Sequence, residues 1–150
     1  MTNPASSPSV QISINEIQLL EFSVSERVKR LKEPLPQSAY EFQFSAQSKA
    51  ISTDKALNIQ LTVSLFEKRS EERKIELCRM KTRTVFHIEN FEEAIKIDAD
   101  QMTIPDVLAA TCHGIAFSAA RGMLVMSLQN TVISNAVLPI INPQVFLPPR

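Results

Sequence analysis

The sequence is poorest in residues on which many binding sites and scaffolds depend. Only 2 of its 150 residues are glycine, which excludes the glycine-rich loops that cradle phosphate groups. Its 2 cysteines, Cys78 and Cys112, are too few for a disulfide framework, and it contains no tryptophan. The opening residues, MTNPASSPS, lack the basic start and apolar run of a signal peptide. We therefore expect a protein of the reducing cytoplasm.

The chain also lacks an excess of either charge, because 16 Lys and Arg balance 16 Asp and Glu. A domain that binds nucleic acid electrostatically carries a clear basic excess, so no nucleic-acid partner is expected. The balance conceals an uneven distribution, since Arg121 is the only charged residue between Val107 and Pro149. We expect a soluble domain with so neutral a final third to bury that third on more than one side.

Residues 122–141 form an uncharged stretch that invites comparison with a membrane span. Their middle is polar, and Pro139 follows close to their end. The polar residues are Ser127, Gln129, Asn130, Thr131, Ser134 and Asn135. Such side chains are costly in hydrocarbon, so membrane insertion is not expected.

Hydrophobic alternation predicts four strands in a single domain, residues 10–150, that follows a loose arm rich in Pro and Ser at residues 1–9. The strands are expected at residues 10–24, 40–46, 57–65 and 75–88. In the first, the apolar face changes parity twice, which two β-bulges would reconcile. The connector 26–37 is long for a tight hairpin and favours strands that are not neighbours, whereas the third and fourth strands are expected to pair.

A long helix is predicted from Pro105 to about Asn130. Thr103 and Asp106 form a variant of the capping box at its start. One apolar stripe is expected on the core side of the helix: Leu108, Cys112, Ile115, Ala119, Met123 and Met126. The predicted fold is therefore α+β, a four-stranded antiparallel sheet followed by one long helix packed on it and a short apolar C-terminal tail.

Small residues on this helix indicate close contact with a second helix. Gly114 and Gly122 each cost about 1 kcal/mol relative to alanine in mid-helix, and close approach of another backbone would account for them. The alanines by themselves are equally explained by helix propensity. An oligomer interface is expected at Ala109, Cys112, Ala116, Ala120 and Met123.

No arrangement of residues indicates catalysis, a metal or a cofactor. Cys78, His87, Cys112 and His113 have no metal-ligand spacing, and nothing orients a base beside either thiol. Arg121 has two equally weighted interpretations, a partnered interface residue or a long side chain that reaches water. A hotdog-type thioesterase also combines a sheet with a long helix, but it places the helix among the early strands and needs a catalytic base.

What remains is apolar surface, which could serve as a groove for apolar peptide. The candidates lie on the connector, the second strand and the tail: Val28, Leu31, Leu35, Phe42, Phe44, Ile140, Ile141 and Phe146. The alternative is that most of them are core, as is usual for aromatic residues on strands.

The order of elements and three stretches of sequence resemble the SecB-like export chaperone family. The stretches are IELCRMKTRTVFHIENF (75–91), ATCHGIAFSAARG (110–122) and LPIINP (138–143). The resemblance covers about residues 10–146. It implies a cytoplasmic homotetramer, a dimer of dimers, that holds unfolded preproteins in apolar grooves without ATP and delivers them to the translocase ATPase SecA. It places the eight candidates above in the grooves, and Glu21 on the face that docks SecA.

The chain also departs from this family in three respects. The family's acidic pair at the end of the first strand is here Glu21 and Ser25, so half of it is missing. The overall charge is balanced where family members are acidic, and the family's second helix is replaced by residues 142–150, with three prolines. An adaptor dedicated to one partner, such as an antitoxin, therefore stands beside the general export chaperone as an alternative.

Overall fold

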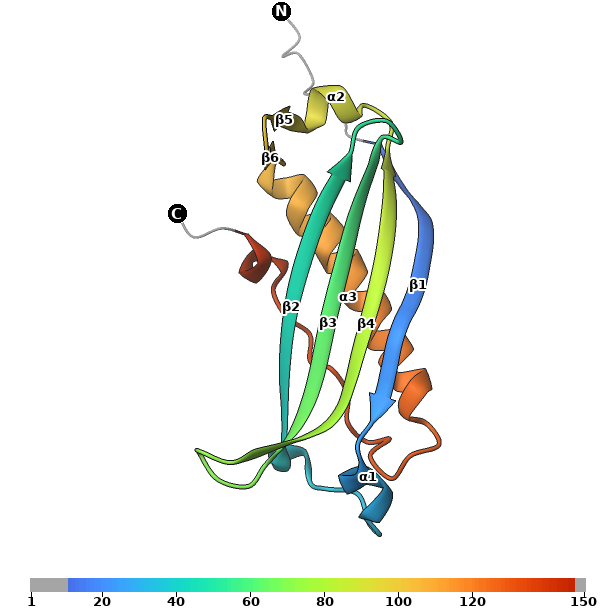
Figure 1. The fold of residues 1–150 in the computed structure, drawn as a ribbon, viewed down its shortest axis with the longest axis vertical. Helices are drawn as coiled ribbons and strands as arrows, with labels where there is room; N and C mark the ends of the chain where they lie inside the picture. The colour runs from blue at the N-terminus through green and yellow to red at the C-terminus, as the bar shows by residue number, and fades with distance from the viewer. Residues whose placement is uncertain (1–10, 148–150) are drawn as a thin grey trace, which may run out of the picture.

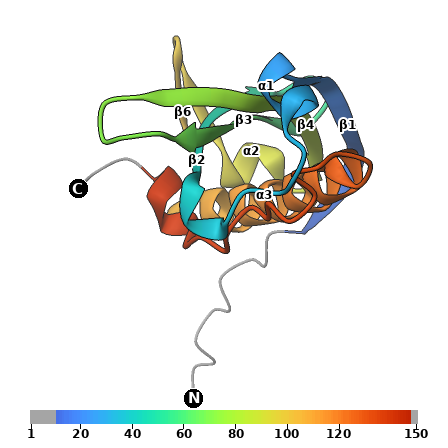
Figure 2. The same ribbon diagram turned by 90° about the horizontal axis from the view of Figure 1, so that it is seen from below.

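The computed structural model describes residues 11–147 and arranges them in two layers, a sheet and a long helix (Figures 1 and 2). The strands are β1 (Ile12–Val24), β2 (Tyr40–Ile51), β3 (Ala56–Lys68) and β4 (Lys74–Ile88). They are antiparallel in the order β1-β4-β3-β2, and the helix α3 (Asp106–Leu128) covers one face of the sheet. The predicted fold class is confirmed, whereas the predicted arm at residues 1–9 lies outside the described residues.

β1 contains both β-bulges that its sequence predicts. Its register against β4 shifts between Ile14 and Glu16 and again between Leu19 and Glu21. Each shift returns the apolar side chains to the face of the sheet that α3 covers, because one extra residue reverses the parity of a strand. As a result Ile17 pairs with Thr84 and Leu19 with Thr82, both of which face the core.

The connector after β1 joins the two edges of the sheet, as its length predicts. It begins with the short helix α1 (Glu26–Arg30) and ends with the 3-10 turn η1 (Gln37–Ala39). Arg27 on α1 donates two hydrogen bonds to the buried carboxylate of Glu67 on β3, at 2.8 and 3.0 Å. Asn135, in the loop after α3, donates to the carbonyl of Leu35 at 2.8 Å. The connector is thus attached at both ends, by a charged pair and by an amide.

The acidic segment between β4 and α3 forms three short elements that were not predicted from the sequence. They are the helix α2 (Phe91–Ala94) and the strands β5 (Lys96–Asp98) and β6 (Gln101–Thr103), which pair with each other. The β5–β6 turn contains Ala99 with a φ of 54°, a left-handed conformation that is uncommon for alanine. Elements this short carry too few residues for a periodic pattern.

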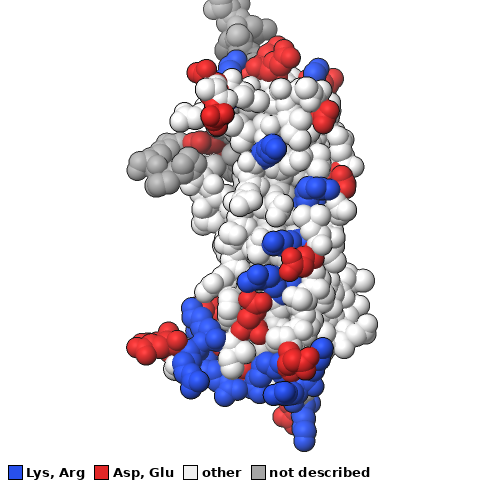
Figure 3. Space-filling view, viewed as in Figure 1, with Lys and Arg blue, Asp and Glu red and all other residues white. Residues whose placement is uncertain are grey.

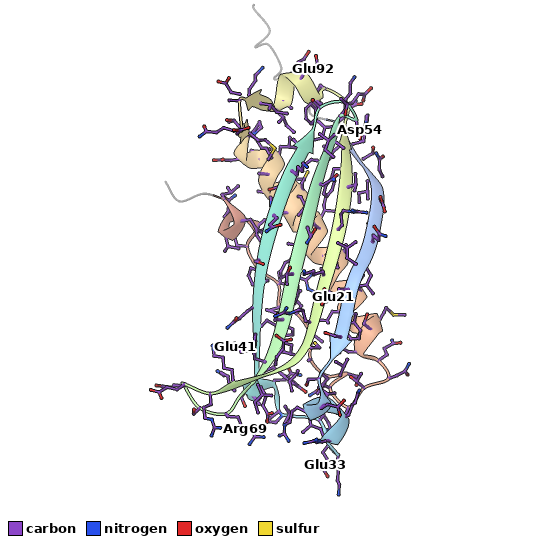
Figure 4. All side chains as sticks on the ribbon, in the orientation of Figure 1. Glu21, Glu33, Glu41, Asp54, Arg69 and Glu92 are labelled. Atoms are coloured by element: carbon purple, nitrogen blue, oxygen red, sulfur yellow. The ribbon has the colours of Figure 1, made fainter. Side chains whose placement is uncertain are left out.

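Basic and acidic side chains predominate at opposite ends of the folded molecule. Figure 3 shows Lys and Arg predominating, with some Asp and Glu among them, at the end formed by the connector and the β3–β4 turn, whereas Asp and Glu predominate at the opposite end. Arg69 marks the basic end in Figure 4, and Glu92 on α2 marks the acidic end. Between the two ends, a row of Lys and Arg with Glu beside them crosses the open face of the sheet, and β1 and β4 contribute the pairs Glu21–Lys81 and Glu16–Arg83.

The helix α3 begins at Asp106 and ends at Leu128, close to the predicted limits, but its start is not the predicted capping box. Thr103 belongs to β6, and the N-cap residue is Pro105, which has no side-chain capping hydrogen bond. The backbone N–H of Ala109 donates to the carbonyl of Pro105 at 2.9 Å, so the first turn closes through the main chain.

The face of α3 that packs on the sheet differs from the predicted stripe. Its buried residues are Leu108, Ala109, Cys112, His113, Ala116, Phe117, Ala120, Leu124 and Leu128. The stripe prediction holds for Leu108 and Cys112, but Met126 is 67% exposed. Three of its small residues, Ala109, Ala116 and Ala120, lie on this buried face and let the helix lie close to the sheet. By length and composition α3 could cross a membrane, and its burial against the sheet accounts for part of its apolar character.

Candidate functional site

An apolar groove lies between α3 and the C-terminal tail. After α3 the chain turns back along the helix and ends in the 3-10 turn η2 (Pro143–Phe146), beside the edge strand β2 in Figure 1. The groove has a volume of about 500 Å³. Its helix wall includes Ala110, Thr111, Gly114, Ile115, Phe117, Ser118 and Arg121, and its tail wall is Ile140, Ile141, Pro143 and Phe146.

One end of the groove is closed by an aromatic cluster that joins strand, helix and tail. The ring of Phe117 on α3 lies edge-on to Phe44 of β2, with centroids 5.3 Å apart. Phe146 lies 5.7 Å from Phe44 and stacks on His113 at 5.1 Å. His113 is itself buried, and its Nδ1 is 2.7 Å from the carbonyl oxygen of Ala109. The cluster therefore fixes the position of η2 on the helix.

Arg121 holds the other end of the tail. Its Nε donates to the carbonyl oxygen of Leu138 at 3.0 Å, and its Nη2 donates to that of Pro139 at 3.1 Å. The guanidinium also lies 5.5 Å from the ring centre of Phe117, within cation–π distance. Arg121 therefore has a partner, as the first of its two interpretations expected. In the described structure, this partner is the protein's own tail.

The structure brings together about half of the predicted peptide-binding residues. Ile140, Ile141 and Phe146 line the groove, and Phe44 contacts Phe146. Leu31, Leu35 and Phe42 are half-buried, pack against the core and do not line the groove. Val28 is only 4% exposed, so its assignment to an open groove is wrong: α1 turns this side chain into the core.

A second groove, of about 510 Å³, lies between β1 and the outward side of α3. Its walls are Ile17 and Leu19 on the strand and Ser118, Ala119, Gly122, Met123, Met126 and Ser127 on the helix. The neighbouring apolar side chains Ile14, Leu20 and Val125 are also exposed. The sequence predicts contact with a second helix at Gly122 and Met123 of this region, but not at the β1 residues Ile17 and Leu19.

The predicted oligomer interface requires correction. Cys112, Ala116 and Ala120 are 0% exposed and Ala109 is 8% exposed within the single chain. Their side chains are already covered by the sheet, so they offer no surface to a second copy. Met123 is the exception, since it is half-buried and lines the groove beside β1. The spacing of small residues identified a packed face of the helix, but that face packs on the sheet.

The two mid-helix glycines have different surroundings. A Cβ added to Gly114 would lie 3.1 Å from Cγ of Pro143, so a larger residue there would require the tail to shift by a few tenths of an ångström. A Cβ added to Gly122 would meet nothing within 4 Å. Within the described chain, Gly122 thus costs helix stability, about 1 kcal/mol relative to alanine, without a compensating contact.

Neither thiol of the chain is activated as a nucleophile. Burial raises the pKa of the Cys78 thiol to about 12 and that of Cys112 to about 11, so both thiols are protonated at neutral pH. Hydrogen bonds from Arg27 lower the pKa of the Glu67 carboxyl group and hold it ionised. Within residues 11–147, no group of three or more His, Cys, Asp and Glu side chains could hold a metal ion.

Glu21, the predicted docking residue, lies on the lower half of β1 in Figure 4. It is exposed, and its Oε2 is 3.8 Å from Nζ of Lys81 on β4. Ser25, at the position of the missing acidic residue, follows the end of β1 and donates its backbone N–H to the carbonyl of Leu77. The site around Glu21 is therefore accessible, with one acidic side chain and a nearby lysine.

The arrangement of sheet, helix and tail is the SecB-like fold. Among solved structures, the chain is similar to the SecB-like chaperone Rv1957 of Mycobacterium tuberculosis, solved in complex with a ChAD peptide from the antitoxin HigA1 (Rv1956). The TM-score is 0.58 at 13% sequence identity, and the match covers 87% of this chain and 90% of that one. No protein-family model matches the sequence, and no curated protein matches it significantly.

Proposed function

We propose that this protein is an ATP-independent chaperone of the cytoplasm that binds unfolded polypeptide in the groove between α3 and the tail. The observation that carries the proposal is the groove itself, which is apolar, open and about 500 Å³ in volume, beside an edge strand. A holdase needs adaptable apolar area and no catalytic group. The similarity to a SecB-like chaperone solved with a bound peptide supports the same interpretation.

The proposal is tested by aggregation of a chemically denatured client in the presence of the purified protein and absence of ATP. We expect suppression at a stoichiometric ratio, together with binding of a fluorescent apolar peptide. Thr111 lines the groove and Val107 lies one turn earlier on α3, outside it, and both are exposed. Thr111→Asp should weaken peptide binding about tenfold, because it places a charge beside apolar peptide, and Val107→Asp should not. Aggregation unchanged by the protein, with no peptide bound, would reject the proposal.

A chaperone dedicated to one partner is the second candidate. It is favoured by the solved relative, whose ligand is a peptide from an antitoxin. The departures at Ser25 and in the tail point the same way, since they alter the regions that the SecB-like family uses for general export. Capture from a lysate of the source cell separates the candidates: a spread of precursor proteins supports the export chaperone, and a single protein with its own binding segment supports the dedicated one.

We further propose that the second groove is covered by another copy of the chain, in a homo-oligomer that is a dimer of dimers. The exposed apolar residues of β1 continue into this groove, and Gly122 leaves room there for a second backbone. Leu19→Asp should lower the native mass from that of four chains, each of 16.8 kDa, to that of a smaller assembly, and the control Val107→Asp should not change it. A monomeric native mass for the unmodified protein would contradict the oligomer.

A further inference from the structure

The tail is bound to the helix in the way an extended peptide would be bound. Residues 136–142 form neither helix nor strand, and the tail between Leu138 and Phe146 carries no charge. Arg121 contacts it through the carbonyl oxygens of Leu138 and Pro139, which are main-chain groups. Since every peptide has such carbonyls, this contact does not depend on the identity of the tail's side chains.

Side-chain recognition is concentrated at the other end of the tail. Phe146 fills the space between Phe44, Phe117 and His113. Just before it, Pro143 lies against Gly114, where the helix has no Cβ. The protein thus provides two separate contacts for one peptide. Arg121 binds main-chain carbonyls, and the aromatic site formed by Phe44, Phe117 and His113 holds a side chain about seven residues further along the peptide.

Between these two contacts the tail is only partly buried, and Ile141 is half-buried against the core. Ile140 is 89% exposed, and the groove of about 500 Å³ remains open beside it. A segment that belonged to the core would bury such a side chain. Instead the tail covers the groove without filling it, so its removal would expose apolar surface that another peptide could cover in the same way.

From this geometry we propose that residues 139–147 are a displaceable occupant of the groove, and that client peptide takes their place on Arg121 and in the aromatic site. This inference rests on the proposed function and specifies its ligand: an extended, uncharged, apolar segment with an aromatic residue about seven positions after the carbonyls that Arg121 binds. The tail competes with clients, and it covers the apolar site in their absence. A client's affinity is reduced by the fraction of time that the tail is docked.

A reversible lock of the tail provides the decisive experiment. The position of a Cβ on Gly114 is 3.7 Å from Cβ of Pro143, which is close to the spacing of a disulfide. The double variant Gly114→Cys, Pro143→Cys can therefore fasten the tail when oxidised. The probes are a fluorescent peptide with the sequence of residues 137–147 and a reduced, carboxymethylated unfolded protein. Both should bind the reduced form and lose at least about tenfold in affinity in the oxidised form, as expected for competition with a tethered segment.

Neighbouring residues of η2 supply a matched pair of variants. Phe146 fills the aromatic site, whereas Val145 is 59% exposed. Phe146→Ser should raise the affinity for both probes several-fold because it releases the tail, and Val145→Ser should leave the affinity unchanged. Truncation after Asn142, which removes η2 and leaves the new carboxylate away from the carbonyls that Arg121 binds, should act like Phe146→Ser. Circular dichroism checks that each variant is folded.

The outcomes separate this inference from the proposed function. Equal binding by the oxidised and reduced forms, or weaker binding after Phe146→Ser, would show that the tail is a fixed wall of the groove and overturn the inference alone. No binding by any folded variant, the truncated one included, would overturn both.

Discussion

The two edges of the sheet are completed in different ways. On the β2 side, the chain returns along α3 and covers its own apolar surface with the tail, so that Gly114 contacts Pro143. On the β1 side, the apolar residues of strand and helix remain exposed, and Gly122 has nothing near it. The same helix thus carries one glycine in each of two grooves. The tail covers the groove at Gly114, and no described segment covers the groove at Gly122. The difference teaches that this fold covers its apolar surface in two ways. A peptide-like segment of the same chain covers the β2 side, and, as we propose, a second copy of the chain covers the β1 side.

The largest expected effect is the loss of the aromatic cluster on the β2 side. Phe117 is 2% exposed and contacts both Phe44 and Phe146. Phe117→Ala should lower the free energy of unfolding by about 3–5 kcal/mol, because it leaves a cavity in the core. On the open side, Met126→Ala removes an exposed side chain and should change stability by at most about 0.5 kcal/mol. Urea unfolding at low protein concentration measures both, and equal losses would remove the distinction between the two sides.

A smaller, pH-dependent effect on the free energy of unfolding is expected at the basic end of the molecule, away from both grooves. The pKa of Glu67 is lowered in the folded protein by hydrogen bonds from Arg27, so the pair stabilises the fold above the ordinary pKa of glutamate, about 4.3, and ceases to do so as pH falls through the lowered value. Glu67→Gln should therefore be less stable than the unmodified protein at pH 7, and the difference should shrink below about pH 4. A difference that stays constant across this pH range would exclude the ion pair as its cause.

The two glycines offer a more direct test of the comparison. Gly122→Ala should stabilise the single chain by up to about 1 kcal/mol through helix propensity and weaken self-association. Gly114→Ala gains the same propensity, but its Cβ meets Pro143 at 3.1 Å, so its net gain should be smaller and the tail should be displaced more easily. Unfolding measurements and sedimentation velocity on the two variants check these expectations. Stronger association of Gly122→Ala would contradict a close contact at that position.

The smallest effect on stability is expected at Glu21. The residue is exposed, and its nearest basic group lies 3.8 Å away, so Glu21→Gln should change the free energy of unfolding by at most about 0.5 kcal/mol. If this residue contributes to docking on a SecA-type ATPase, the variant should bind that protein less tightly while it still binds apolar peptide. Unchanged binding to the ATPase would remove Glu21 from the docking surface.

Several features could be predicted because they are written in local patterns. The parity changes of β1 indicated both bulges, and the alternation around Leu61 indicated a strand, which the structure places inside the sheet with its inward residues buried. Arg121, alone in a neutral stretch, was open to two interpretations, and the structure gives it a partner in the tail. The helix faces could not be predicted in this way, because α3 is apolar around most of its circumference and its pattern does not distinguish sheet from partner.

The candidate site was only partly predictable for a related reason. The sequence indicated apolar residues on the connector and the tail, but their exposure depends on how these segments fold back. Val28 turned out to be core, whereas Ile140 is nearly fully exposed. Arg121 donates to the main-chain carbonyl oxygens of Leu138 and Pro139. Contacts with main-chain groups are hard to predict from residue types, because every residue has a carbonyl.

By itself, the sequence determined the order of the strands along the chain, the bulges of β1, the approximate limits of α3 and the absence of charge from the final third. These features follow from periodicity and composition, which act over a few neighbouring residues. Only the tertiary structure decided which side of α3 meets the sheet, which glycine contacts the tail, and which apolar residues remain exposed. Those outcomes depend on contacts between segments far apart in the chain, and burial is a property of the packed whole.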